Sequence, residues 1–355
     1  MRLDVASTLS TLVNWVQKDA LPIWLERSLH VPEGWFSAHL SRSGLPLEGA
    51  PIQLVAQAQM LYLLAKAERI GWVSGQRKTA RQLIDFVGRH GTLPCRSDGY
   101  VRSLESPSVI LDSRYDPVDH ASFVIANTAC FAAFGEMSDL RRAYNILDWL
   151  HIHFAEGTAW KGIDRTVEAE PELYRHMLWA FLDLAEITQK PAWHQRAKAL
   201  FDHCVARLHV TPITQAAVKP AAFDWCERLA WVRVLCQCEH VLGAGLSTAV
   251  SFYRDALAPG HLPTVAGAQV KGDVRAEAIA AGFALLAADV NGITDAVMVQ
   301  LECFFRDYLV SDLPGIFTDE PWKAQESVGS LATLVRLFDA AVLAQQLLAR
   351  SSHSE

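Results

Sequence analysis

The sequence lacks the features that would point to a membrane or to a nucleic acid. No apolar run reaches ~18 residues, the length that a membrane-spanning helix needs. Lysine and arginine form no basic stripe, and the net charge is -7. The opening residues, MRLDVASTLSTLVNWVQK, have no long apolar core of the kind found in a signal peptide. We therefore expect a cytoplasmic protein without a membrane partner and without a nucleic-acid partner.

Cysteine is sparse and irregularly spaced. The seven cysteines are an odd number in apolar surroundings, which argues against a disulfide framework and for a reducing compartment. Cys236, Cys238 and His240 come nearest to a metal motif, but the two cysteines would point to different faces of a helix. No glycine-rich phosphate loop is present. The sequence therefore predicts no metal and no cofactor.

Proline and glycine are also few, at 15 and 20 of 355 residues, and helical periodicity dominates instead. Apolar residues at the spacing i, i+3, i+4 predict about twelve helices. The expected ranges are 6–27, 51–72, 76–90, 118–136, 138–154, 170–188, 190–207, 225–242, 245–257, 273–291, 293–310 and 325–349.

The connections between these helices alternate between short and long. The long ones are rich in proline, glycine and aromatics, and 28–50 and 91–112 are expected to form small hairpins. Helical hairpins joined in this way form either a closed ring or a solenoid, and the lack of internal sequence repeats favours the ring. We expect an all-α fold with one domain over 1–350 and a disordered tail over 351–355, with binding residues gathered on the long-loop rim.

Several sequence runs add a family resemblance that covers most of the chain. LPIWLERSLHVPEGWFSAHLSRSGLPL, QAQMLYLLAKAERIGW, SDGYVRSL, VDHASFVIANTACFA and YRHMLWAFLDLAEIT occur in this order. The set resembles the N-acylglucosamine 2-epimerase superfamily, which comprises sugar epimerases and isomerases built as (α/α)6 barrels with small β-hairpins on the loop side. The resemblance implies a small-molecule sugar substrate, no metal, and a monomer or a homodimer.

The chemistry that the resemblance implies is proton transfer between C1 and C2 of a sugar. Two titratable groups with pKa values near neutrality are needed for this, and the family uses two histidines. His176 matches a family histidine on a helix, with Glu172 and Trp179 on the same stripe. The alternative interpretation of His176 is a hydrogen-bonded histidine that packs beside Trp179.

Other family positions predict how the sugar is held. Gln53 stands where the family has an arginine, and Gln57 is retained one turn later. Glutamine can bind hydroxyl groups but cannot anchor an anion as a guanidinium does, which argues against a phosphorylated sugar. His120 is a candidate ligand of the rim. Its neighbour Asp119 is either a helix cap or a rim residue.

Both positions of the family's usual catalytic histidines are changed. The first falls on Asp224 or Trp225, with Glu227 or Arg228 as the neighbouring polar group. At the second, the run PWKAQESVG keeps Trp322 and Lys323 and then offers Glu326. The family's acid survives as Glu277. Carboxyl groups can replace imidazoles when burial raises their pKa. The predicted catalytic set is His176, Glu227, Glu277 and Glu326.

Tryptophans are the remaining candidate ligands, because indole rings stack on sugars. We expect Trp35, Trp160, Trp225 and Trp322 near the rim, and Trp15, Trp149 and Trp231 in the core.

Three functional hypotheses remain open. The first is a sugar 2-epimerase or aldose–ketose isomerase acting on a neutral hexose or N-acylhexosamine. The second is a catalytically degenerate carbohydrate-binding or accessory protein of polysaccharide metabolism. The third is a glycoside hydrolase or lyase on the same barrel, which requires two facing carboxyl groups.

Overall fold

The computed structural model describes residues 5–93, 96–156, 159–164, 170–208, 225–258, 270–310, 313–320 and 328–352. The chain divides into two compact units, and each is described by itself. Unit 1 comprises 1–29, 39–47 and 219–355, and unit 2 comprises 30–38 and 48–218. The single domain over 1–350 stays a prediction.

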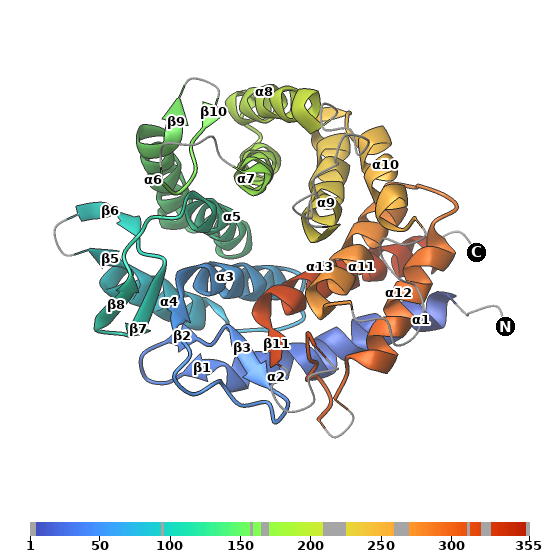
Figure 1. The fold of residues 1–355 in the computed structure, drawn as a ribbon, viewed down its shortest axis with the longest axis horizontal. Helices are drawn as coiled ribbons and strands as arrows, with labels where there is room; N and C mark the ends of the chain where they lie inside the picture. The colour runs from blue at the N-terminus through green and yellow to red at the C-terminus, as the bar shows by residue number, and fades with distance from the viewer. Residues whose placement is uncertain are drawn as a thin grey trace, which may run out of the picture. The chain divides into compact units, whose positions relative to one another are not determined.

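Unit 2 is built from three helical hairpins in two layers. Helices α3 (Leu54–Arg69), α5 (Pro117–Phe134) and α7 (Pro171–Thr188) lie side by side in one layer (Figure 1). Helices α4 (Arg77–His90), α6 (Met137–Phe154) and α8 (Pro191–Leu208) each pack on the preceding helix of that layer. Helix α5 is buried on most of its circumference, as a helix between two neighbours must be.

Small strands connect these hairpins. They are β2 (Trp35–Phe36), β4 (Ile52–Gln53), β5 (Thr92–Leu93), β6 (Arg96–Tyr100), β7 (Ser103–Ser106), β8 (Val109–Asp112), β9 (Ala155–Glu156) and β10 (Ala159–Trp160). Strands β4, β7 and β8 form an antiparallel sheet in that order, and β5 pairs with β6. The hairpins expected over 28–50 and 91–112 are therefore present, with β1 (Leu29–His30) and β3 (His39–Ser41) in the first of them.

Unit 1 repeats the two-layer arrangement. Helices α9 (Trp225–Leu242), α11 (Gly272–Ala287) and α13 (Leu331–Ser352) lie side by side. Helices α10 (Leu246–Ala256), α12 (Thr294–Asp307) and α1 (Val5–Trp15) pack on α9, α11 and α13 respectively. Strand β11 (Val328–Ser330) pairs antiparallel with β3.

The helix expected over 6–27 is interrupted. Helix α1 passes through a π-turn over Val16–Ala20 into α2 (Leu21–Arg27), and the N–H of Leu21 donates to the carbonyl of Val16. Pro22 has no N–H to continue the α-helical ladder, so the extra residue of the π-turn falls immediately before it.

The last expected helix also differs at both ends. Residues 328–330 form β11, and α13 begins at Leu331 instead of 325. Ser351 and Ser352 are helical, so the disordered tail predicted from 351 starts too early, and 353–355 lie outside the described residues. The hydroxyl groups of Ser351 and Ser352 donate to carbonyls of the preceding turn, which satisfies acceptors at this helix end.

Helix α13 is long and apolar enough to cross a membrane by length and composition alone. Its packing gives another reason for that composition. Leu334, Leu337 and Phe338 are fully buried, and the helix contacts α1 and α11. The helix therefore has the features of a core helix of unit 1.

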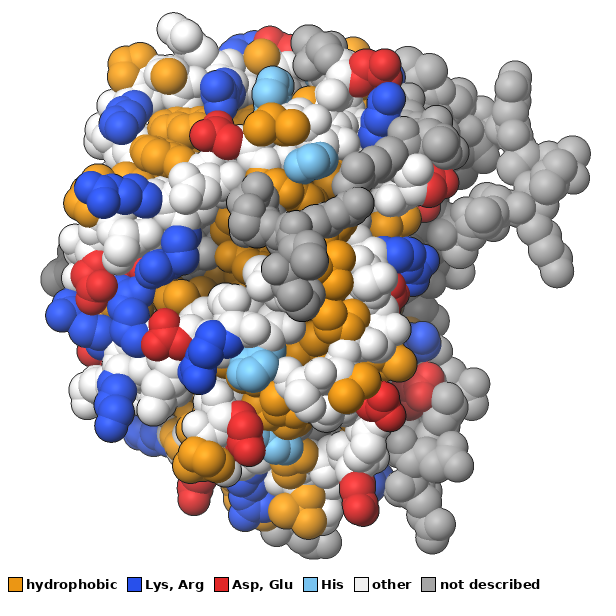
Figure 2. All heavy atoms as spheres, turned by 90° about the vertical axis from the view of Figure 1, so that its left-hand side faces the viewer, with side chains coloured by type: hydrophobic (Ala, Val, Ile, Leu, Met, Phe, Trp, Pro, Cys, Tyr) orange, Lys and Arg blue, Asp and Glu red, His pale blue; other side chains and the backbone are white. Residues whose placement is uncertain are grey.

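Charge is mixed over the face drawn in Figure 2. Lysine and arginine side chains alternate there with aspartate and glutamate, and hydrophobic side chains lie between them. A nucleic-acid surface would instead gather one sign of charge.

The close approach of helices in unit 1 can be tested with a pair of glycines. A Cβ at Gly282 in α11 would overlap Val297 Cγ2 and lie 2.5 Å from the Tyr253 hydroxyl, whereas a Cβ at Gly88 in α4 would meet open space. We expect Gly88→Ala to raise the free energy of unfolding by up to about 1 kcal/mol. Gly282→Ala should lower it by about 1–3 kcal/mol despite the better helix propensity of alanine. Urea denaturation measures both; equal effects would contradict the packing.

Candidate functional site

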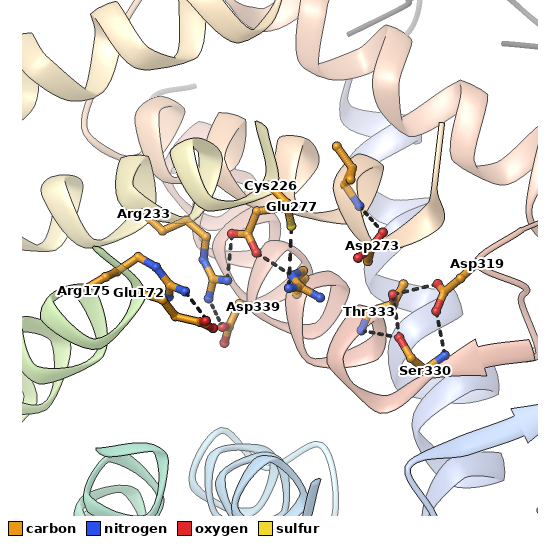
Figure 3. Close-up of polar contacts among 12 residues, drawn as sticks. Glu172, Arg175, Cys226, Arg233, Asp273, Glu277, Asp319, Ser330, Thr333 and Asp339 are labelled. Carbon is orange, nitrogen blue, oxygen red and sulfur yellow. Dashed lines mark hydrogen bonds and ion pairs between the residues drawn. The ribbon is translucent and has the colours of Figure 1, made fainter. Parts of the chain in front are cut away.

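A buried network of acids and arginines joins helices α9, α11 and α13 of unit 1. Arg233 Nη1 donates to Glu277 Oε1 at 3.1 Å, and Arg336 Nε donates to Glu277 Oε2 (Figure 3). Arg233 also donates to Asp339. The side chains of Glu277 and Asp339 are only 2% and 8% exposed. Because an unpaired buried carboxylate is costly, these arginines stabilise the acids as well as joining α9, α11 and α13.

The network changes the role predicted for Glu277. Both of its carboxylate oxygens accept from guanidinium groups, so neither is placed to move a proton. Sequence reasoning missed Arg233, Arg336 and Asp339. The sequence holds one indication of this network. Arg336 and Asp339 are three positions apart in α13, and residues at that spacing are neighbours on one face of a helix.

Arg336 also reaches the start of α9. Its Nη2 lies 3.7 Å from Cys226 Sγ. Burial disfavours the charged guanidinium, but Cys226 and Glu277 outweigh that effect, and the pKa of Arg336 is raised. The guanidinium is therefore a permanent positive charge in this network.

A third carboxylate, that of Asp319, organises the start of α13. Its oxygens accept from the Ser330 backbone N–H at 3.1 Å and from the Thr333 hydroxyl at 2.7 Å (Figure 3). Burial raises the pKa of Asp319 to about 6, against these two hydrogen bonds. The predicted residues Trp322, Lys323 and Glu326 follow in the chain and lie outside the described residues.

The residues predicted at the start of α9 are placed only in part. Asp224 and the side chain of Trp225 lie outside the described part of the structure. Glu227 is half-buried. Arg228 turns toward α10, where its guanidinium lies 3.7 Å from Asp255 and over the ring of Phe252. Burial lowers the pKa of Arg228, and Asp255 opposes this. These contacts place Arg228 between α9 and α10, and its contact with a sugar stays a prediction.

His176 lies on α7 in unit 2 and is half-buried. Its Nδ1 is 2.9 Å from the carbonyl oxygen of Glu172. A carbonyl can only accept, so Nδ1 carries the hydrogen and the neutral ring has its lone pair on Nε2. Trp179 meets the ring of Tyr62 edge-on at 5.7 Å, and Glu172 is exposed with Arg175 3.7 Å away. The predicted stripe of acid, imidazole and indole is therefore present on one helix.

Gln57 has a structural role instead of the predicted contact with a sugar. Its amide is fully buried and exchanges two hydrogen bonds of 2.8 Å with the backbone of Phe36 in β2. It also donates to the carbonyl of Gln53, which is half-buried at the start of α3. Gln57 thus fixes the first hairpin onto α3.

His120 is also structural, which corrects its prediction as a ligand. Its Nδ1 donates to the Asp116 carbonyl at 2.6 Å, and its Nε2 accepts from the Tyr100 backbone N–H at 2.8 Å. The ring is fully buried and stacks on Trp149 at 4.2 Å. Burial lowers the pKa of His120 to about 4, so the ring is neutral at pH 7.

Asp119, next to His120, is not the helix cap. Asp116 caps α5 by accepting from the Val118 N–H at 2.9 Å. Asp119 is 5% exposed, and its Oδ2 is buried without a hydrogen-bond partner among the described residues. Burial first, and then the charge of Asp116, raise the pKa of Asp119 to about 8, although Arg102 opposes them. Asp119 is therefore protonated at neutral pH.

The three tryptophans predicted for the core are buried, whereas Trp225 and Trp322, predicted near the rim, have side chains outside the described part of the structure. Trp15, Trp149 and Trp231 are buried core residues. Trp35 is half-buried and stacks on His30 with ring centroids 3.5 Å apart. Trp160 is 7% exposed, so it packs in the core, which corrects its prediction as a ligand. Among the described residues, no group of histidine, cysteine and acidic side chains could hold a metal ion, and the six described cysteines are buried thiols outside any disulfide.

A comparison with known proteins identifies the family to which the chain belongs. The sequence profile of the N-acylglucosamine 2-epimerase (GlcNAc 2-epimerase) family matches residues 34–217, just over half of the 355-residue chain. The chain belongs to this family. No sequence among curated proteins matches the epimerase-family chain.

Solved structures agree on the fold of this epimerase-family protein. A D-mannose isomerase has a TM-score of 0.76 at 16% identity, covering 96% of this chain and 98% of that chain. The cellobiose 2-epimerase from Spirochaeta thermophila has a TM-score of 0.73 at 16% identity, covering 98% and 99%. An inactive variant of an α-1,6-mannanase from a Salegentibacter species, in complex with α-1,6-mannotetrose, has a TM-score of 0.66 at 14% identity, covering 96% and 99%. These relatives are (α/α)6 barrels, which confirms the predicted fold class.

The buried network predicts that the protein loses much of its stability when Glu277 loses its charge. We expect Glu277→Gln to lower the free energy of unfolding by about 3–5 kcal/mol, because two guanidinium groups lose their shared carboxylate in a buried site. The matched control is Asp202→Asn, which breaks the exposed Lys198–Asp202 pair on α8 and should cost within about 0.5 kcal/mol. Similar losses for the two variants in urea denaturation would contradict the network's role.

The raised pKa of Asp119 predicts that the stability of the folded protein depends on pH. Its pKa is raised from 3.8 to about 8 on folding, so the folded protein binds this proton more tightly than the unfolded chain does. The resulting stability is present at low pH and is lost as pH rises from about 4 through about 8. Asp119→Asn should remove this loss. We expect its advantage over the parent to grow by about 1–3 kcal/mol between pH 5 and pH 8; a constant difference in thermal or urea denaturation would refute the assignment.

Proposed function

We propose that the protein is a sugar 2-epimerase or aldose–ketose isomerase that acts on a neutral hexose or N-acylhexosamine. The observation that carries this proposal is the geometry of His176. Its Nδ1–H is held by the Glu172 carbonyl, which directs the basic Nε2 away from the helix backbone. A half-buried imidazole whose tautomer is fixed suits proton transfer.

The proposed reaction begins with an open-chain aldose. Nε2 of His176 removes the proton from C2, so the C2–H bond breaks, an N–H bond forms, and the electron pair gives an enediolate over C1 and C2. Return of the proton to C1, with loss of the O2 proton and gain of one at O1, gives the ketose. Return to the opposite face of C2 gives the epimer and requires a second acid.

Membership in the family supports a carbohydrate substrate, and two structural relatives bear the names D-mannose isomerase and cellobiose 2-epimerase. Gln53, in place of an arginine, favours an uncharged sugar, since an amide cannot neutralise a phosphate. We further propose a cytoplasmic monomer or homodimer, for which the buried thiols outside any disulfide are a supporting observation.

A carbohydrate-binding protein without turnover is the second candidate. The observation that favours it is the double arginine contact of Glu277, which withdraws one of the predicted catalytic acids from proton transfer. The structural similarity to the α-1,6-mannanase is the support for a glycoside hydrolase or lyase. That similarity concerns the fold alone.

Deuterium exchange tests the proposed chemistry. In D2O, the parent protein should place deuterium at C2 of at least one sugar in a panel of hexoses and N-acetylhexosamines, as followed by NMR. His176→Gln should slow this exchange by at least about 100-fold, the usual contribution of a general base. His151→Gln is the matched control, because His151 is exposed on α6 of the same unit.

The outcomes separate the candidates. Equal exchange by the parent and His176→Gln would overturn the assignment of the base. No exchange with any sugar, together with calorimetric binding of one of them, would overturn the isomerase and favour the binding protein.

A further inference from the structure

A small cavity lies in unit 2, where helices α3, α4, α5 and α6 meet strand β6. Apolar side chains of α3, α4 and α5 form most of its wall, and its polar lining residues are Tyr100 of β6, Asn127 of α5 and Arg142 of α6. Its volume is about 10 Å³, which is the space needed for one water molecule or one small ion. The size alone therefore limits the ligand to a few atoms.

The polar groups of the wall are hydrogen-bond donors. Asn127 is 2% exposed, and its Nδ2 gives one hydrogen to the Phe123 carbonyl at 2.8 Å and keeps a second. The Oδ1 atom of Asn127 already accepts from Arg142 Nε at 3.2 Å. Burial raises the pKa of Tyr100, although Arg142 opposes this, so the phenol keeps its proton and can donate it in a hydrogen bond.

The charged groups beside the cavity leave a positive excess. Asp139 accepts from both Arg81 and Arg142, and Glu136 lies 3.0 Å from Arg81 and 3.7 Å from Arg77. Three guanidinium groups therefore share two carboxylates. Among the described residues that line the cavity, Arg142 is charged and none carries a carboxyl group. A buried anion needs a positive partner of this kind, because its desolvation is otherwise too costly.

Donors without acceptors suit an anion better than a water molecule. A water molecule in the cavity would have to place its own two hydrogens on acceptors, whereas a halide ion only accepts. The apolar wall favours an ion that gives up its hydration shell easily. The side chain of Arg142 is 31% exposed, so it can shift to admit an ion slightly larger than water.

We propose that this cavity binds one weakly hydrated monovalent anion, such as chloride or bromide, between Arg142, Tyr100 and Asn127. The proposal goes beyond the sugar chemistry, because no described lining residue belongs to α7, the helix of His176. The ion would join β6 to α5 and α6. The backbone N–H of Tyr100 also donates to His120 Nε2 at 2.8 Å, so the ion would stabilise the strand that holds this buried ring.

Thermal denaturation in different sodium salts tests the site. A ligand that binds only the folded protein raises Tm with its concentration, so chloride and bromide should raise Tm by about 2 °C or more above fluoride at equal ionic strength. General salt effects on stability run in the opposite order, because strongly hydrated anions are excluded from protein surfaces. A parent protein that is stabilised most by fluoride would overturn the proposal.

Two substitutions test the wall itself. Tyr100→Phe removes the hydroxyl but keeps the ring that packs on His120 and Phe123, and it should weaken chloride binding about 10-fold. Val87→Ile adds a methyl group to the lining and should abolish binding, while denaturation in fluoride reports whether the variant folds. The matched control is Tyr144→Phe on α6, whose hydroxyl faces Lys190, and it should keep the chloride effect. Equal chloride dependence in all three variants would contradict the site.

Crystals grown in sodium bromide locate the ion directly. Anomalous scattering should place one bromide within hydrogen-bonding distance of Arg142 and the Tyr100 hydroxyl. Bromide ions found only at surface positions would overturn the proposal. None of these measurements involves a sugar, so their failure would leave the proposed isomerase intact, and absence of C2 exchange would leave the anion site intact.

Discussion

Burial of charge is the constraint on which the arrangement of unit 1 depends. Glu277 lies in the middle of α11 at 2% exposure, and its carboxylate is acceptable there only because Arg233 and Arg336 approach from the helices on either side. Asp339 then balances Arg233. Apolar packing alone would let neighbouring helices slide or rotate by small amounts, whereas guanidinium–carboxylate contacts fix both the depth and the rotation of each helix.

Unit 2 also pairs a buried acid with arginines, since Asp139 contacts Arg81 and Arg142, and it further ties buried polar side chains to its short strands. His120 and Gln57 are buried, and each is satisfied by backbone atoms of a strand segment, so the short strands are tied to the helices below them. His176 and Asp119 stand apart from this pattern. One is half-buried with a fixed tautomer, and the other is buried without a hydrogen-bond partner among the described residues. Groups that a fold does not need for its own stability are the ones available for chemistry.

The sequence predicted what depends on local pattern. Helices α3 and α5 are found within three residues of their expected ends, because the apolar stripe is a property of the helix itself. It could not predict contacts between distant residues. Gln57 bonds Phe36 across 21 positions, and Glu277 bonds Arg336 across 59, so their roles depend on packing that no local pattern records. Asp116 and Asp119 are both plausible caps in the sequence, and only the backbone conformation at Asp116 distinguishes them.

The contact between α1 and α13 has a consequence for synthesis on the ribosome. Unit 2 draws almost all of its residues from one stretch, 48–218, and its hairpins are made in order. Unit 1 joins a helix that starts at Val5 to one that starts at Leu331. Since translation proceeds from the N-terminus, the apolar side of α1 must wait without its partner while the rest of the protein is made. The contact between α1 and α13 therefore forms only after the residues of unit 2, which lie between them in the chain, have been synthesised.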